Sequence, residues 1–210
     1  MENYKKNLEL LIKNHVYSKD MEHDACGVGL IASTEGKKSR AVVEYGIEAL
    51  KAVWHRGAVD ADGKTGDGAG IHVEIPKDFF IEKIQVTGHD YDNSEICVGM
   101  IFLPRNDYSA QESCKTIVES ELTKNNFSIY GWRQVPVNPK VLGEKALQTM
   151  PEIIQVLFKS NDTNLLDKNL ERKIYETRKR IENKAFNASL NNFYICSISS
   201  KSIIYKGLYL

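Results

Sequence analysis

The stretch His23-Asp-Ala-Cys26-Gly-Val-Gly-Leu-Ile31 decides how the rest of this sequence is interpreted. A cysteine stands at the head of an apolar run that continues to Ser33 and is bounded by turn-forming residues. Such a run predicts a short strand buried on both faces. Its two glycines, Gly27 and Gly29, predict that something packs closely against this backbone. Free cysteines most often act as small buried hydrophobes, so a chemical role for Cys26 depends on what the rest of the chain supplies.

A helix and a glycine-rich loop follow this run. The helix is predicted over residues 42–54, because apolar side chains recur along one face at Val43, Ile47, Leu50 and Trp54. It delivers His55-Arg56-Gly57, in which Gly57 occupies the position of a helix C-cap glycine. The loop Gly63-Lys-Thr65-Gly66-Asp67-Gly68-Ala-Gly70 then leads into a strand predicted over residues 69–75.

Composition excludes several classes of protein. The chain has 210 residues, enough for one substantial domain, and its 28 basic and 28 acidic residues cancel. No basic block marks a nucleic-acid partner. No run approaches the roughly 20 apolar residues of a membrane span, and the N-terminus lacks the apolar core of a secretory signal. We therefore expect no nucleic acid and no membrane as partners, and a cytoplasmic protein.

The four cysteines are widely separated, at positions 26, 97, 114 and 196. No Cys-x-x-Cys pair or zinc spacing occurs among them. Cys97, Cys114 and Cys196 fall inside apolar strand-like or helix-like runs, which predicts buried thiols in a reducing compartment. We expect no metal in this segment, although the residues alone leave open a site that combines His23, Cys26, His55 and Asp67.

The remainder of the chain alternates irregularly between strands and helices, without a repeat. Strands are predicted over 96–103, 127–135 and 153–158, and helices over 107–123, 141–149 and 167–186. Residues 193–198 and 202–205 predict a hairpin that turns at Ser199-Ser-Lys201. The predicted fold class is α+β, in layers. The sequence stops directly after an apolar strand, so we expect the fold to be incomplete at the C-terminus.

Two familiar motifs fail at the glycine-rich loop. Gly63-Lys64-Thr65 resembles the close of a phosphate-binding P-loop, but Ala58 stands where that motif needs its first glycine, and a helix leads in where a strand should. The pair Asp60 and Asp62 resembles a calcium loop, but Lys64 stands where a third oxygen ligand is required.

Cysteine chemistry near neutral pH needs a base, because a free thiol has a pKa of about 8.5. The sequence offers no papain-type histidine and aspartate set. One economical alternative is cleavage before Cys26, since the new α-amino group has a pKa of about 8 and serves as the base. Residues 1–25, which carry an amphipathic helical pattern, are then either an ordinary N-terminal arm or a segment that is removed.

The segments 21–29, 55–58 and 65–71 together resemble the start of glutamate synthase large subunits. That region is a class II glutamine amidotransferase domain, an N-terminal nucleophile hydrolase with an αββα sandwich. Residues 193–207 resemble later strands of the same domain. By this resemblance, residues 1–25 are a propeptide-like leader and residues 26–210 are the N-terminal part of the amidotransferase domain.

The resemblance implies roles for particular residues. The Cys26 thiolate attacks the side-chain amide of glutamine, releases ammonia and leaves a γ-glutamyl thioester that water hydrolyses to glutamate. Arg56 and Gly57 hold the cysteine terminus and thiol, although Arg56 also suits a cation at a helix C-terminus. The loop residues Thr65, Gly66, Asp67 and Gly68 place backbone tightly against the site.

The family's oxyanion-hole and substrate-binding residues have no match here and are expected beyond Leu210. Loss of one oxyanion donor typically costs about 10²–10³ in rate, so this chain alone is expected to be inactive or nearly so. FMN and an iron–sulfur cluster are expected on the rest of the family's large subunit, with none in this segment. Glutamine, the remainder of the synthase chain and a small subunit are the implied partners. Two alternatives stay open: another class II amidotransferase or amide hydrolase, and a non-catalytic remnant.

Overall fold

The computed structural model describes residues 2–14, 27–54, 57–165 and 167–208. The chain divides into two compact units, residues 1–30 and 31–210, and each is described by itself. In the first unit, α1 (Glu2–Lys13) confirms the helix expected from the N-terminal pattern. Tyr4 and Leu10 on this helix are exposed.

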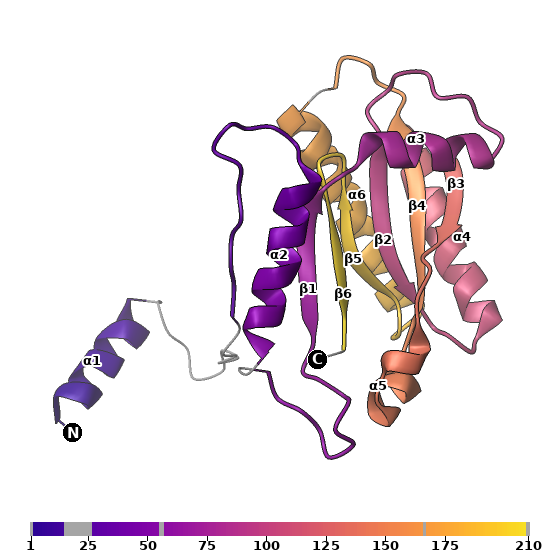
Figure 1. Ribbon diagram of the computed structural model, residues 1–210. Helices are drawn as coiled ribbons and strands as arrows, with labels where there is room; N and C mark the ends of the chain where they lie inside the picture. The colour runs from indigo at the N-terminus through magenta and orange to yellow at the C-terminus, as the bar shows by residue number, and fades with distance from the viewer. Residues whose placement is uncertain (1, 15–26, 55–56, 166, 209–210) are drawn as a thin grey trace. The chain divides into compact units, whose positions relative to one another are not determined.

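The second unit contains the remaining elements, and Figure 1 labels its α-helices and strands in chain order. They are α2 (Arg40–Ala52), β1 (Ala69–Glu74), α3 (Lys77–Val86), β2 (Cys97–Leu103), α4 (Tyr108–Lys124), β3 (Phe127–Gln134), η2 (Pro139–Val141), α5 (Glu144–Thr149), β4 (Glu152–Ser160), α6 (Asp167–Asn187), β5 (Tyr194–Ser199) and β6 (Ser202–Gly207). Asp107 is the N-cap of α4, and its carboxylate accepts a hydrogen bond from the Ala110 N–H at 2.9 Å.

The described strands form two antiparallel sheets. One has the strand order β3-β4-β2-β5, and its central pair aligns Cys97 with Phe158 and Leu103 with Glu152. The other joins β1 to β6, the first and last described strands of this unit, from Ala69 opposite Gly207 to Glu74 opposite Ser202. The chain therefore closes on itself through a pairing of residues more than a hundred positions apart in sequence.

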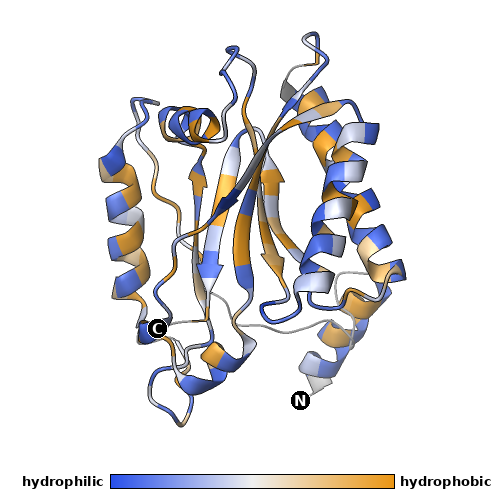
Figure 2. Ribbon diagram, turned by 90° about the vertical axis from the view of Figure 1, so that its right-hand side faces the viewer, coloured by the Kyte–Doolittle hydropathy of each residue, from blue (hydrophilic) through white to orange (hydrophobic). Residues whose placement is uncertain are grey.

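Two apolar cores cover the two faces of the four-stranded sheet. The helix-side core lies between that sheet and helices α4 and α6, and includes Cys114, Val118, Leu122, Phe127, Phe158, Leu170 and Ile174. The inter-sheet core lies between the two sheets and α3, and includes Phe80, Ile84, Val98, Met100, Leu157 and Ile203. In Figure 2 the helices carry both blue and orange residues, as expected for helices that cover a sheet with one face.

Helix α2 packs against β1, which adds a further helix to the layers. The layers are therefore helices α4 and α6, the four-stranded sheet, the two-stranded sheet, and helix α2. This mixed α/β architecture with antiparallel sheets is consistent with the predicted αββα sandwich of an N-terminal nucleophile hydrolase.

The predicted hairpin of residues 193–205 is wrong in its pairing, although both strands exist. β5 pairs with β2 and β6 pairs with β1, so the two strands belong to different sheets. The Glu171 carboxylate on α6 holds the turn between them, because it accepts hydrogen bonds from Ser200 N–H at 2.7 Å and Ser199 Oγ at 2.9 Å. These bonds redirect the chain from one layer to the next.

The predicted buried strand at Cys26–Ser33 is also wrong over the part that is described. Residues 27–33 form no strand, and Val28 and Leu30 are 94% and 88% exposed. No described heavy atom lies within 4 Å of the positions that a Cβ on Gly27 or Gly29 would occupy. A strand needs a neighbour to complete its ladder hydrogen bonds, and the local apolar pattern does not specify that neighbour.

The end of α2 differs from its prediction as well. The helix ends at Ala52 with Val53 as its C-cap, and Trp54 is 69% exposed. Gly57 is therefore not the C-cap residue, and its φ lies outside the left-handed region that such a glycine adopts. Val43, Ile47 and Leu50 do share a half-buried face, as the periodicity predicts.

Candidate functional site

The predicted site residues separate into two groups. Cys26 and Arg56, together with His55, lie outside the described residues. Gly57, Thr65, Gly66, Asp67 and Gly68 are described, and all belong to one loop. We call residues 57–68, which connect α2 to β1, the site loop.

The stem of the site loop is a short antiparallel pairing. Val59 and Gly66 form an isolated bridge, and the Asp67 N–H donates to the Ala58 carbonyl at 3.2 Å. At the base, Asp67 Oδ1 lies 3.4 Å from the position that a Cβ on Gly57 would take. The Asp67 carboxylate is therefore beside the residue that directly follows Arg56.

Beyond the stem, the glycines lie against strand β6. Gly68 has a φ of 108°, and a Cβ there would lie 3.2 Å from the Gly207 carbonyl oxygen. A Cβ on Gly70 would lie 2.9 Å from the Cβ of Lys206. The expected close approach of backbone is thus present at these two glycines, and the neighbouring backbone belongs to β6.

The tip of the site loop is organised by one carboxylate. Asp62 Oδ1 accepts hydrogen bonds from the backbone N–H groups of Thr65 at 2.7 Å and Lys64 at 2.9 Å, and Thr65 Oγ1 donates to Asp62 Oδ2 at 2.5 Å. The Thr65 hydroxyl, followed by these N–H groups, holds the pKa of the Asp62 carboxyl well below its usual value. Thr65 is 8% exposed, so its hydroxyl is enclosed.

The tip also contacts α5, which lies beside the site loop in Figure 1. Thr65 Oγ1 accepts a hydrogen bond from the Ala146 N–H at 3.4 Å, and Lys145 Nζ donates to Asp60 Oδ2 at 2.6 Å. Gly143, immediately before α5, approaches the tip closely enough that a Cβ would lie 2.2 Å from Thr65 Oγ1.

Sequence reasoning missed this contribution of α5. Asp62 binds the N–H groups of residues two and three positions further on. An aspartate in that position is a local turn signal, which can be recognised in the sequence. Gly143 carries no local signal for its partner, because the partner lies about 80 residues away in the chain.

The three described cysteines are buried and free, as predicted. Burial raises the pKa of the Cys114 thiol to about 11, and it also raises the pKa values of Cys97 and Cys196 above the ordinary value. Because the thiolate is the reactive form, these three side chains are inert near neutral pH.

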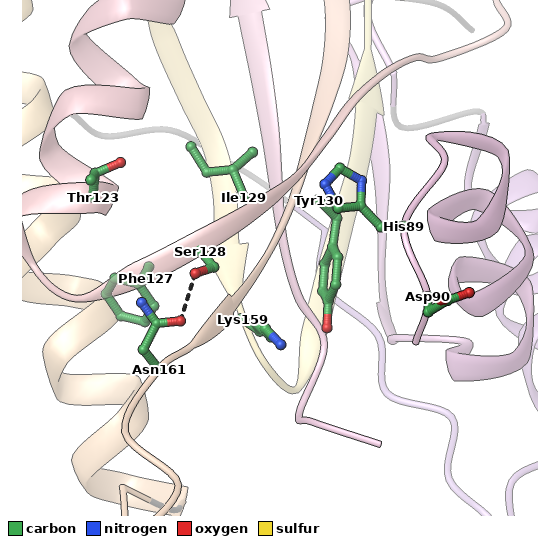
Figure 3. Close-up of a pocket in the computed structure, with 9 residues that line it drawn as sticks. All are labelled: His89, Asp90, Thr123, Phe127, Ser128, Ile129, Tyr130, Lys159 and Asn161. Carbon is green, nitrogen blue, oxygen red and sulfur yellow. Dashed lines mark hydrogen bonds between the residues drawn. The ribbon is translucent and has the colours of Figure 1, made fainter. Parts of the chain in front are cut away.

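A separate open hollow of about 570 Å³ lies beside β3, lined by residues that Figure 3 draws. Two of its polar side chains bind other protein groups. Ser128 Oγ donates to Asn161 Oδ1 at 2.6 Å, and the Tyr130 hydroxyl donates to Asp92 at 3.1 Å. It shares no residue with the site loop, so it is not the predicted site.

The described part of the chain contains no group of three or more His, Cys, Asp or Glu side chains placed to hold a metal ion. None of its helices is long and apolar enough to cross a membrane.

Comparison with known proteins identifies the family. The family model described as "glutamine amidotransferases class-II" matches residues 26–210. The chain therefore belongs to the class-II glutamine amidotransferases, a family of enzymes, and the resemblance seen in the sequence is confirmed.

Two similar curated proteins are glutamate synthases. The chain is 52% identical over 207 residues to the glutamate synthase (NADPH) large chain of Azospirillum brasilense, covering 99% of this chain and 14% of that protein. It is 39% identical over 189 residues to ferredoxin-dependent glutamate synthase 1 of Arabidopsis thaliana, covering 89% of this chain and 12% of the relative. The chain thus spans about a seventh or less of the length of these relatives.

Proposed function

We propose that this chain is the glutamine-hydrolysing part of a glutamate synthase, which releases ammonia from glutamine for transfer to 2-oxoglutarate. The observation that carries the proposal is the family match over residues 26–210, whose first residue is a cysteine. The 52% identity to a glutamate synthase large chain supports the choice among class II amidotransferases. A cytoplasmic location is part of this proposal.

In the proposed reaction, residues 1–25 are removed and Cys26 becomes the N-terminus. Its α-amino group takes the thiol proton, and the thiolate attacks the side-chain carbonyl carbon of glutamine. The carbon–nitrogen bond breaks, the proton passes to the leaving nitrogen, and ammonia departs from a γ-glutamyl thioester. Water then cleaves the carbon–sulfur bond, which gives glutamate and restores the thiol.

The described residues support Cys26 as the nucleophile by contrast with the other cysteines. Cys97, Cys114 and Cys196 are all buried, with raised pKa values that disfavour their thiolates. Arg56 and Gly57 are proposed to hold the Cys26 terminus and thiol, and Gly57 is the first residue of the site loop.

The remaining machinery is proposed to lie on further polypeptide. The oxyanion donors and the groups that bind the α-amino and α-carboxylate groups of glutamine follow Leu210. FMN and an iron–sulfur cluster are held by the rest of a synthase large subunit, and a small subunit is a further partner. The 210-residue chain alone therefore has little or no glutaminase activity.

The test uses the full synthase polypeptide that carries this chain. Cys26→Ala is expected to abolish glutamate formation from glutamine and 2-oxoglutarate, while added ammonium, which bypasses the amide cleavage, still supports it. Cys114→Ala is the control and is expected to retain glutamine-driven turnover. Glutamine-driven turnover by Cys26→Ala would contradict the proposal.

A further inference from the structure

We infer that α5 is a positioning element for the amidotransferase site, because it holds the tip of the site loop and thereby sets the backbone that carries Arg56. We call the contact among Asp62, Thr65, Gly143 and Ala146 the latch. The inference rests on the proposed function, in which Arg56 holds the nucleophile. The latch residues are proposed as positioning residues that act through Arg56.

The first support is that loop and helix complete each other's hydrogen bonds. The first N–H groups of a helix have no partner within it, and Gly143 at the N-cap of α5 offers no side chain to bind them. The site loop supplies part of that cap, because Thr65 Oγ1 accepts a hydrogen bond from the Ala146 N–H at 3.4 Å. Lys145 Nζ on α5 in turn donates to Asp60 Oδ2 of the loop at 2.6 Å. The tip is therefore bound to α5 by directional contacts.

The second support is the fit at Gly143, which is buried. A Cβ there would lie 2.2 Å from Thr65 Oγ1, 2.3 Å from Asp62 Oδ2 and 2.5 Å from the Thr65 backbone nitrogen. Rotation of a side chain cannot relieve a clash with a backbone nitrogen. Any larger residue at position 143 must push the tip of the site loop away from α5.

The third support is that backbone contacts join the tip to the segment that directly follows Arg56 in the sequence. Asp60 N–H donates to the Thr65 carbonyl at 2.9 Å, and the Val59–Gly66 bridge follows at once. At the other end, Gly68 and Gly70 are packed against β6, which fixes that strand of the loop. Movement at the tip is therefore passed through these pairings to residues 57–60, the segment that directly follows Arg56 in the sequence.

The expected consequence is a loss of turnover. A misplacement of about 1 Å in a positioning group can cost on the order of 10²-fold in rate. Because Arg56 is proposed to hold the nucleophile, kcat should fall more than the KM for glutamine rises. The ammonium-driven reaction should be unaffected, since it does not use Cys26.

The main experiment introduces Gly143→Ala into the full synthase polypeptide, with Gly46→Ala as the matched control. A Cβ on Gly46 meets only Ile71 Cδ1, at an ordinary contact distance of 3.5 Å. Gly143→Ala is expected to lower glutamine-driven kcat about 10- to 100-fold with ammonium-driven turnover unchanged. Gly46→Ala is expected to leave both rates unchanged. Alkylation of Cys26 should slow in Gly143→Ala alone.

A second pair of variants keeps the inference testable if Gly143→Ala does not fold. Thr65→Val preserves shape but removes the hydroxyl that bridges Asp62 and the Ala146 N–H, so it should lower kcat in the same way. Thr65→Ser restores the hydroxyl and should recover most of the rate. The double variant Gly143→Ala/Thr65→Val should be no slower than the worse single variant, because both changes break one contact.

The outcomes separate this inference from the proposed function. Wild-type glutamine-driven kcat in Gly143→Ala and Thr65→Val, while Cys26→Ala is inactive, would overturn the latch and leave the proposed function standing. An equal fall of glutamine-driven and ammonium-driven turnover would also overturn it, because the effect would be general. Activity in Cys26→Ala would overturn the proposed function itself.

Discussion

Two regions of the chain both carry apolar side chains at helical or strand spacing but differ in burial. In the helix-side core, Phe158, Val118 and Leu122 are completely buried between α4, α6 and the four-stranded sheet. In α2, all of whose residues are described, no side chain is buried. Trp54, which follows α2, is largely exposed, as is Leu30 in the N-terminal apolar run.

The difference teaches that an apolar pattern predicts an element more reliably than it predicts what covers that element. The helix-side core is assembled from elements that contact one another directly, namely β2, α4, β3, β4, α6 and β5. The residues proposed for catalysis are attached to α2 and the N-terminal run instead. The residues that form the helix-side core and the residues proposed for catalysis thus belong to different parts of the chain.

Among the changes considered, truncation of a core aromatic side chain should lower the free energy of unfolding the most. Phe158 packs edge-to-face on Phe127, with the ring centroids 5.3 Å apart. Phe158→Ala should lower the free energy of unfolding by about 3–5 kcal/mol, from lost burial and the remaining cavity. Urea denaturation measures it. Phe186→Ala on α6 is the matched control: its side chain is 79% exposed, so we expect a change within about 0.5 kcal/mol. Equal losses in both variants would contradict the burial difference.

Loss of the carboxylate that redirects β5 into β6 should have the next largest effect. Glu171 accepts hydrogen bonds from Ser199 Oγ, Ser200 Oγ and the Ser200 N–H. Glu171→Gln places an amide donor against these donors, so the free energy of unfolding should fall by about 1.5–3 kcal/mol. Glu176→Gln is the control, since Glu176 forms an exposed pair with Arg172 worth about 0–1 kcal/mol. A loss in Glu171→Gln no greater than in the control would show that the carboxylate does not hold the turn.

These residues also show what could be predicted from sequence. The strand at 96–103 and the helix that Asp107 caps are fixed by local periodicity and capping, and both are confirmed. The separation of β5 from β6, and the contact of Gly143 with Thr65, depend on partners distant in the chain. Local rules favoured a hairpin at Ser199-Ser-Lys201 because they contain nothing about Glu171. The site loop was found from its glycines, but the role of α5 could not be.

The buried thiol of Cys114 makes the free energy of unfolding depend on pH in the alkaline range. The pKa of Cys114 is about 11 in the folded chain and about 9 in the reference state, so on raising the pH the unfolded chain loses its proton first. The stability that Cys114 contributes is complete below pH 9 and declines between pH 9 and 11. The free energy of unfolding, measured by urea denaturation, should therefore fall less between pH 8 and pH 10.5 in Cys114→Ala than in the unmodified chain. Parallel losses in the two proteins would mean that Cys114 titrates freely when folded.

The smallest change in the free energy of unfolding is expected for a truncation in α2, the less buried of the two regions. Leu50 in α2 is half-buried, whereas Leu122 in α4 is completely buried. Full burial of a leucine side chain stabilises by about 1.5–3 kcal/mol, so Leu50→Ala should lower the free energy of unfolding by about 1 kcal/mol or less. Leu122→Ala carries the additional cavity cost and should lose about 2–5 kcal/mol. If Leu50→Ala lost as much as Leu122→Ala, the face of α2 would have to be covered in solution. The segment that leads to Arg56 would then be held by packing of α2, in addition to the contacts of the site loop with α5.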